Sequence, residues 1–235
     1  MAIKSKFTKR SDGRKFDEAR EMDAKVGIIP SADGSAMFRS GSTIAIAAVH
    51  GPRILHPQHM QNPKKGILRV NYNMMSFSVD DRIRPGLSKR SQEISKVTEW
   101  ALSPCVDLEE FKGNVVDVFI QIPQADAGTR AAGINAAAMA LAHAGIPMKE
   151  MASCTAIGKM DKTLAVDVSK EEEDFSEGEG STDIPMCCLS RTKKISLLQL
   201  DGKISVDELK EAIEMGKIAC GKINEIQAKA LKEIE

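Results

Sequence analysis

The order of strand-like and helix-like segments is the feature of this sequence that most restricts its fold. Apolar and polar residues alternate over residues 115–122, which is the two-residue period of a strand, and Pro123 follows. Residues 128–144 are rich in Ala, Met and Leu and end at Gly145 and Pro147, as a buried helix with a C-terminal stop does. This unit predicts that the first half of the chain is a sheet followed by a buried helix.

Two further strands and one helix are expected earlier in the chain. Residues 43–49 and 67–77 read as strands, and residues 53–66 between them contain prolines and a lysine pair typical of an exposed loop. A helix is expected to begin near Ser88 or Ser91, where apolar residues start to recur at three- and four-residue spacing.

The pattern of strands followed by a helix restarts after about residue 150. Residues 154–160 and 163–168 are typical of a hairpin, and residues 195–200 of another strand. A capping box from Ser205 to Glu208 opens a long C-terminal helix. We therefore predict an α+β fold of two related halves, with sheets packed against helices in a single compact domain.

The 235 residues can bury a sizeable core, and we divide them into an N-terminal arm (1–16), a first half (17–149) and a second half (150–235). The 5 scattered cysteines include no CxxC pair, which argues against a disulfide framework or a zinc site. No apolar run approaches the ~20 residues of a membrane span. We expect a soluble cytoplasmic protein with buried thiols and no membrane partner.

Charges of opposite sign gather in different segments, although 33 basic and 33 acidic side chains cancel. The basic segment holds Arg82, Arg84, Lys89 and Arg90, with a Pro-Gly turn between them. Such cations can follow the phosphates of a single-stranded nucleic acid, and the loop pair Lys64–Lys65 can add to them. A solvated basic loop is the alternative.

A second motif, Gly128-Thr129-Arg130, joins the strand of residues 115–122 to the start of the following helix. The N–H groups at a helix N-terminus favour an anion, and Gly128 lets it approach the backbone. Thr129 adds a hydroxyl donor, and the forked guanidinium of Arg130 suits a phosphate. The alternative is a helix cap followed by a surface charge.

The third motif is the acidic segment of residues 170–182, which we expect to be a loop. Its carboxylates can hold a magnesium ion or act as general acid and base near a phosphate, unless they are only a solvated face. Asp183 differs from the rest, because it directly precedes Ile184-Pro185-Met186 and is expected to lie against the core.

These motifs together resemble the RNase PH family, over residues 8–220 or so. Within the family, the Arg-Pro-Gly, Lys-Arg-Ser and Glu-Ile-Ser elements are most similar to the catalytic RNase PH-like subunit of archaeal exosomes. The ordered motifs are Ser11-Asp-Gly-Arg14, Gly34-Ser35-Ala36, Val49-His-Gly-Pro52, Tyr72-Asn73-Met74, Arg84-Pro-Gly86, Lys89-Arg-Ser-Gln-Glu-Ile-Ser-Lys96 and Ala125-Asp-Ala-Gly-Thr-Arg130.

The resemblance implies a two-half βαβα-type fold and a 3′→5′ exoribonuclease, a nuclease in the broad class of hydrolases, that degrades single-stranded RNA. Inorganic phosphate would be the co-substrate, nucleoside diphosphates the products, and tail addition the reverse reaction. The implied assembly is a hexameric ring of three heterodimers with a non-catalytic RNase PH-like subunit, capped by RNA-binding proteins. A non-catalytic ring subunit that guides RNA and a tRNA-trimming RNase PH are the alternatives.

The resemblance also implies roles for particular residues. Gly128, Thr129 and Arg130 match the phosphate-binding turn. Asp183 matches the second of two catalytic carboxylates, which would also hold Mg²⁺. The matches to RNA-binding positions are Lys89 and Arg90 near the RNA 3′ end, Arg82 and Arg84 just upstream, and Lys64 and Lys65 at the narrow opening of the central pore.

The first catalytic carboxylate is where this sequence departs from the family. The family places its two aspartates six positions apart, whereas Asp174 and Asp183 are nine apart, which indicates an insertion of about three residues. We expect Asp174 to be the first catalytic and metal-binding carboxylate. Glu173 and Glu177 remain alternatives, the latter because it has the six-position spacing.

Overall fold

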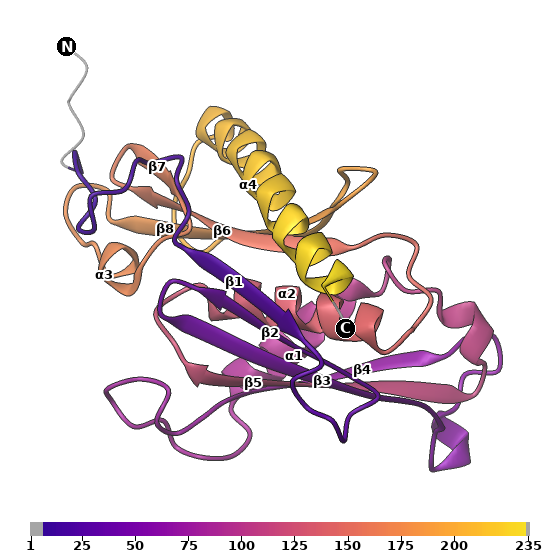
Figure 1. The fold of residues 1–235 in the computed structure, drawn as a ribbon. Helices are drawn as coiled ribbons and strands as arrows, with labels where there is room; N and C mark the ends of the chain where they lie inside the picture. The colour runs from indigo at the N-terminus through magenta and orange to yellow at the C-terminus, as the bar shows by residue number, and fades with distance from the viewer. Residues whose placement is uncertain (1–6, 234–235) are drawn as a thin grey trace.

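The computed structural model describes residues 7–233, and a five-stranded sheet forms the first half of the chain (Figure 1). The sheet has the strand order β1-β2-β3-β5-β4. Neighbouring strands are antiparallel except β4 and β5, which run parallel, so their carboxyl ends lie side by side. The strands are β1 (Met22–Val26), β2 (Gly34–Ser40), β3 (Thr43–Ile54), β4 (Ile67–Met74) and β5 (Asn114–Gln124).

The second half forms a four-stranded antiparallel sheet of order β7-β6-β8-β9. Every residue of β6 is buried, because β6 is a central strand covered by α2 and α4. The strands are β6 (Ala152–Met160), β7 (Thr163–Val166), β8 (Ser181–Leu189) and β9 (Ile195–Leu198).

Two helices join these sheets into one α+β domain, as predicted. The helix α2 (Thr129–His143) contacts β2, β3 and β5 of the first sheet and β6 of the second, so it is buried all round (Figure 1). Its alanines let the sheets come close, and a Cβ on Gly34 of β2 would lie 2.4 Å from the carbonyl oxygen of Ala140. The helix α4 (Val206–Lys232) lies across β6 and β1.

The remaining helices are short or lie at the edge of the core. The helix α1 (Lys89–Leu102) begins after Ser88, whose hydroxyl accepts from the backbone N–H of Ser91, and it packs against β4. The helix α3 (Lys170–Glu173) is one turn long. Two 3₁₀ turns, η1 (Gln58–Met60) and η2 (Leu108–Phe111), complete the set.

Most segments with a strong local pattern were predicted correctly, and segments with a weak pattern were not. The sequence did not indicate β1 or β2, because β1 is a half-exposed edge strand and β2 begins with Gly-Ser and ends with Ser, which leaves only a short apolar stretch between them. The strand expected over residues 67–77 ends at Met74, and β5 continues past Pro123. The prediction of a loop over residues 170–182 is wrong at both ends, because the segment begins with α3 and ends with the start of β8.

The N-terminal segment packs on the second half from residue 7 onward. The guanidinium of Arg10 is buried and donates to both carboxylate oxygens of Glu172 and to the carbonyl oxygens of Val166 and Asp167. The part of the expected arm before residue 7 lies outside the described residues. All five cysteines are free and buried, as expected. Within residues 7–233, no helix has the length and apolar character needed to cross a bilayer.

Candidate active site

The carboxyl ends of the parallel strands β4 and β5 mark the candidate site. The chain leaves β5 and enters α2 through residues 125–128, and the end of β4 lies next to it. Ligands of open sheets bind beyond the carboxyl ends of parallel strands. The start of β8 and the residue after β9 bring polar groups from the second sheet, so both halves of the chain contribute to the site.

The turn before α2 has a backbone that suits an anion site. Ala127 and Gly128 both have left-handed conformations, with φ of 52° and 63°. Gly128 is the N-cap of α2 and offers no side chain to the first N–H groups of the helix. A Cβ at Gly128 would meet Arg20 Nη2 at 3.3 Å, so glycine is favoured on two grounds. The helix N-terminus is therefore open to an anion.

A buried ion pair and a hydroxyl brace this turn. Arg20 Nε and Nη2 donate to the two carboxylate oxygens of Asp167 at 3.0 and 2.7 Å, and Arg20 Nη1 donates to the carbonyl oxygen of Asp126. Burial disfavours the charged form of Asp167, but Arg20 outweighs it and lowers the pKa of this carboxyl. Thr43 Oγ1 donates to the carbonyl oxygen of Ala127 at 2.8 Å. Arg20 and Thr43, which lie far from the turn in the sequence, therefore hold its backbone in place.

Arg130 follows the turn and lies over the site. Its side chain is 20% exposed, and its Nη1 donates to Gln199 Oε1 at 2.6 Å. Its Nη2 is 3.4 Å from Glu93 Oε2 of α1. Thr129 is buried beside Tyr72 of β4, where burial raises the pKa of the Tyr72 hydroxyl and Thr129 partly offsets the rise.

Asp183 reaches the same region from β8. Its backbone pairs with Asp201 through two N–H···O bonds of 2.9 Å. Burial raises the pKa of Asp183 to about 6; the negative charge of Glu173 adds to the rise, and Arg130 opposes it. Its buried Oδ1 has no hydrogen-bond partner among the described residues. A carboxyl group that titrates near pH 6 can hold and release a proton at physiological pH.

The three candidates for the first carboxylate, Asp174, Glu173 and Glu177, lie in α3 or shortly after it and differ in their exposure. Asp174 is 62% exposed and pairs with Lys170 Nζ at 2.6 Å, at the end of α3. Glu173, named above as an alternative, exerts the largest charge effect on Asp183. Glu177, the other alternative, is exposed in the loop between α3 and β8.

Two of the predicted RNA-binding cations share a hollow next to the turn. Arg84 and Arg90 line a cavity of about 80 Å³ with Tyr72 and Asn73 of β4. Arg90 also acts on Asp183, whose pKa it lowers against the effect of burial. The other predicted RNA-binding residues are exposed cations outside this cavity: Arg82, Lys89, Lys64 and Lys65.

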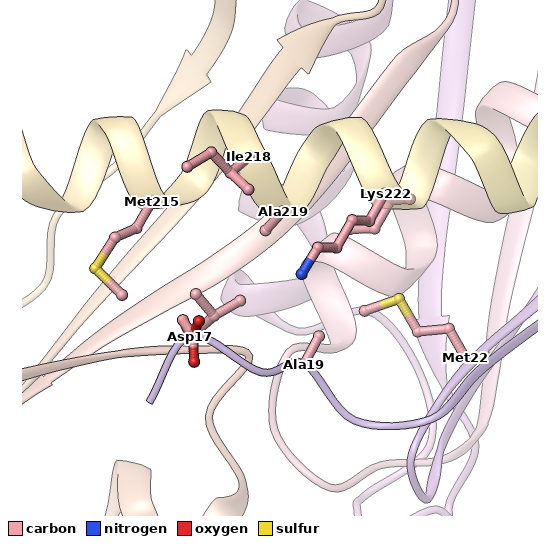
Figure 2. A pocket seen from close by; sticks show the side chains of 9 residues that line it. Asp17, Ala19, Met22, Met215, Ile218, Ala219 and Lys222 are labelled. Carbon is pink, nitrogen blue, oxygen red and sulfur yellow. The ribbon is translucent and has the colours of Figure 1, made fainter. Parts of the chain in front are cut away.

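Another cavity, of about 110 Å³, lies under α4 and is unlike the candidate site (Figure 2). Met215, Ala219 and Met22 make its wall largely apolar, and Asp17 and Lys222 are its charged residues. It contains neither the turn nor the carboxylates described above. We therefore place the candidate site at the turn and not under α4.

The acidic groups offer few ligands for a metal. No cluster of three or more His, Cys, Asp or Glu side chains suited to a metal ion occurs within residues 7–233. Mg²⁺, however, usually uses one or two carboxylates, with water and substrate phosphates as its other ligands. The unpartnered Oδ1 of Asp183, close to Glu173, fits that mode of binding.

Sequence reasoning assigned no role to five residues of the site. Glu93 and Tyr72 lie inside motifs of the family resemblance, which was the one available signal. Arg20, Asp167 and Gln199 reach the site only through tertiary contacts, and nothing in their local sequence distinguishes them from surface residues.

The fold and the site together define a 3′ exoribonuclease of the RNase PH class. Residues 18–147 match the 3′ exoribonuclease family, domain 1, and residues 150–219 match domain 2. The chain belongs to this family, which confirms the resemblance. Its relatives include the exosome complex component Rrp41 of Thermococcus kodakarensis, at 46% identity over 96% of this chain and 89% of that protein. Rrp41 of Archaeoglobus fulgidus is 45% identical over 94% of this chain and 86% of that protein.

Solved structures show the same fold. Rice Rrp46 matches with a TM-score of 0.84 and 24% identity, over 95% of this chain and 100% of that chain. A chain of the Archaeoglobus fulgidus exosome with RNA bound to the active site matches with a TM-score of 0.78 and 23% identity, over 92% of both chains. These two matches support the two-half RNase PH fold.

Proposed function

We propose that this chain degrades single-stranded RNA from the 3′ end by phosphorolysis and releases nucleoside diphosphates. One observation carries the proposal: the open N-terminus of α2, Arg130 and a carboxyl group that titrates near pH 6 come together where the two halves meet. Such a site offers an anion position and a proton donor at the same place. Membership of the 3′ exoribonuclease family supports the choice of RNA as substrate.

The chemistry follows from the placement of these groups. Phosphate on the turn of residues 128–130 attacks the last phosphodiester in line, and the bond from phosphorus to the preceding 3′ oxygen breaks. Arg130 and the helix N–H groups stabilise the charge on the phosphoryl oxygens. Asp183, in its protonated form, gives its proton to the leaving 3′ oxygen. The reverse reaction adds nucleotides from nucleoside diphosphates.

Phosphate takes the position that water has in a hydrolase, so the broad expectation of a hydrolase is wrong. Mg²⁺ binding is the alternative role of Asp183, because one carboxyl group cannot donate a proton and hold the metal at the same time. An ionised Asp183 and a second carboxylate would hold Mg²⁺, which would neutralise phosphate charge. We propose Glu173 as that second carboxylate in preference to Asp174, because Glu173 raises the pKa of Asp183 and is less exposed than Asp174, at 35% against 62%. Lys170 Nζ contacts both carboxylates, at 3.6 Å for Glu173 and 2.6 Å for Asp174.

The exposed cations are proposed to bind the RNA backbone. Arg84 and Arg90 line the hollow beside the turn and suit the nucleotides next to the cleaved bond. Phosphate contacts carry no sequence information, so recognition is expected to be independent of sequence. The proposed path continues through the remaining cations: Arg82, Lys89, Lys64 and Lys65.

The proposed assembly is a hexameric ring in which this chain alternates with a non-catalytic RNase PH-like subunit, under RNA-binding cap proteins in the cytoplasm. Support comes from the relatives, which are named as exosome components. In this arrangement the present chain supplies the turn and Asp183, and the assembled ring guides the RNA.

The test is phosphorolysis of single-stranded RNA by the chain assembled with its ring partner. We expect nucleoside diphosphates only when phosphate is present, and loss of turnover with retained RNA binding in Asp183→Ala. In Arg130→Ala, we expect the phosphate requirement to rise. Absence of products from a fully assembled ring would instead favour a non-catalytic subunit that guides RNA.

A further inference from the structure

Two polar side chains from different parts of the fold hold Arg130 in one orientation. Gln199, which follows β9, accepts from Arg130 Nη1 at 2.6 Å, and Glu93 of α1 lies 3.4 Å from Arg130 Nη2. Gln199 Nε2 also donates to Glu93 Oε1 at 3.1 Å. The three side chains therefore form a closed triangle in which each one contacts the other two.

Secondary structure holds the backbones of Gln199 and Glu93, and the Glu93 side chain is 45% exposed. The backbone N–H of Gln199 donates to the carbonyl oxygen of Pro185 in β8 at 3.1 Å, and Glu93 belongs to the second turn of α1. Arg130 Nε is buried and has no partner among the described residues. A long arginine side chain loses considerable rotamer freedom when it binds a ligand, so holding it beforehand lowers that cost.

The charges of Gln199 and Glu93 indicate that the triangle orients the Arg130 guanidinium. Gln199 carries no charge, so it adds no attraction for an anion. Glu93 is an anion, and its charge alone weakens the binding of a second anion nearby. Glu93 therefore does not help phosphate binding through its charge. Its contribution is to close the hydrogen-bonded triangle around Arg130, which fixes the direction of the guanidinium.

We infer that Glu93 and Gln199 are positioning residues that hold Arg130 ready for the attacking phosphate. This inference rests on the proposed phosphorolysis. Because Glu93 comes from the first half and Gln199 from the second, the packing of the two halves sets the direction of the guanidinium. Neither residue touches phosphate or RNA in this role; both act through Arg130.

The test compares steady-state constants for phosphate and for RNA in the assembled ring. Gln199→Leu should raise the KM for phosphate about tenfold, the change produced by roughly 1.4 kcal/mol of weaker binding. Glu93→Ala should raise this KM by less, because it also removes a negative charge that repels phosphate. The KM for RNA should stay within about twofold. Glu93→Gln keeps one of the two acceptor contacts and should give an intermediate rise.

The control is Glu99→Gln on the same helix, which removes a carboxylate that pairs with Lys96 at 2.6 Å and is outside the triangle. Its phosphate KM should equal that of the parent chain. Adding Gln199→Leu to Arg130→Ala should raise the phosphate KM no further, because a residue that acts through Arg130 has nothing left to position.

Three results would overturn the inference while leaving phosphorolysis intact: an unchanged phosphate KM in Gln199→Leu, equal rises in both KM values, or a further additive rise in the Arg130→Ala background. If one variant fails to assemble, the other tests the same triangle. Failure of the parent ring to release nucleoside diphosphates is a separate result, and it would reject the proposed function itself.

Discussion

The substitution Asp183→Asn should stabilise the folded chain at neutral pH while removing its activity. Asp183 is mostly buried, and its pKa rises from the ordinary 3.8 to about 6. In the unfolded chain the pKa of this carboxyl is near its ordinary value. Above pH 6 the group is ionised in both states, and because the folded state disfavours the ionised form, its charge lowers the free energy of unfolding. An asparagine has no such cost at any pH.

The size and sign of the effect follow from proton linkage. Each unit between the two pKa values corresponds to about 1.36 kcal/mol, so the ionised carboxylate costs ~3 kcal/mol above pH 6. At pH 5 roughly half of that cost remains, and well below pH 4 almost none. For a chain of this size, ~3 kcal/mol corresponds to a rise in Tm of about 6–12 °C.

The assay is chemical unfolding of parent and variant at pH 5 and pH 7.5, in buffer without phosphate and with a chelator, because bound ligands would stabilise the parent. The matched control is Asp174→Asn, which removes an exposed carboxylate and should change stability by less than about 0.5 kcal/mol. If the variant is no more stable than the parent at pH 7.5, or gains the same stability at both pH values, the ionised Asp183 does not destabilise the fold.

Further predictions concern the brace, the second carboxylate and the RNA path. Arg20→Leu leaves a buried carboxylate unpaired and should cost about 3–5 kcal/mol in urea unfolding, whereas a loss below about 1 kcal/mol would contradict the brace. Glu173→Gln should lower the pKa of Asp183, followed by NMR titration, and Asp174→Asn should not; the opposite order would favour Asp174. Arg84→Ala should weaken binding of single-stranded RNA and reduce the salt slope by about 0.7, and an unchanged slope would place Arg84 off the RNA path.

Local patterns explain why much of the fold could be predicted. The helix α2 is framed by a left-handed glycine at its start and by Gly145 at its end, and both signals are visible in the sequence. Likewise the cap of α4 depends on Ser205 and Glu208, which lie three residues apart. In contrast, β2 is a strand because it pairs with β3 along its whole length, and its own composition does not show this.

Sequence motifs indicated some members of the candidate site, and only tertiary contacts bring in the others. Gly128, Thr129 and Arg130 are consecutive, so a single motif indicated their role. The brace between Arg20 and Asp167 joins residues 147 positions apart, and no local pattern predicts such a pair. The first carboxylate was assigned by counting positions, which an insertion makes unreliable, whereas the charge effect of Glu173 on Asp183 depends on folded distances.

In the proposed reaction, inorganic phosphate held at the α2 turn is the group that attacks RNA. The most direct measurement supplies radiolabelled inorganic phosphate and unlabelled single-stranded RNA to the assembled ring and follows the label. The label should appear in the terminal phosphate of nucleoside diphosphates, and Arg130→Ala should reduce this at low phosphate. Unlabelled nucleoside monophosphates, formed at the same rate without phosphate, would contradict it.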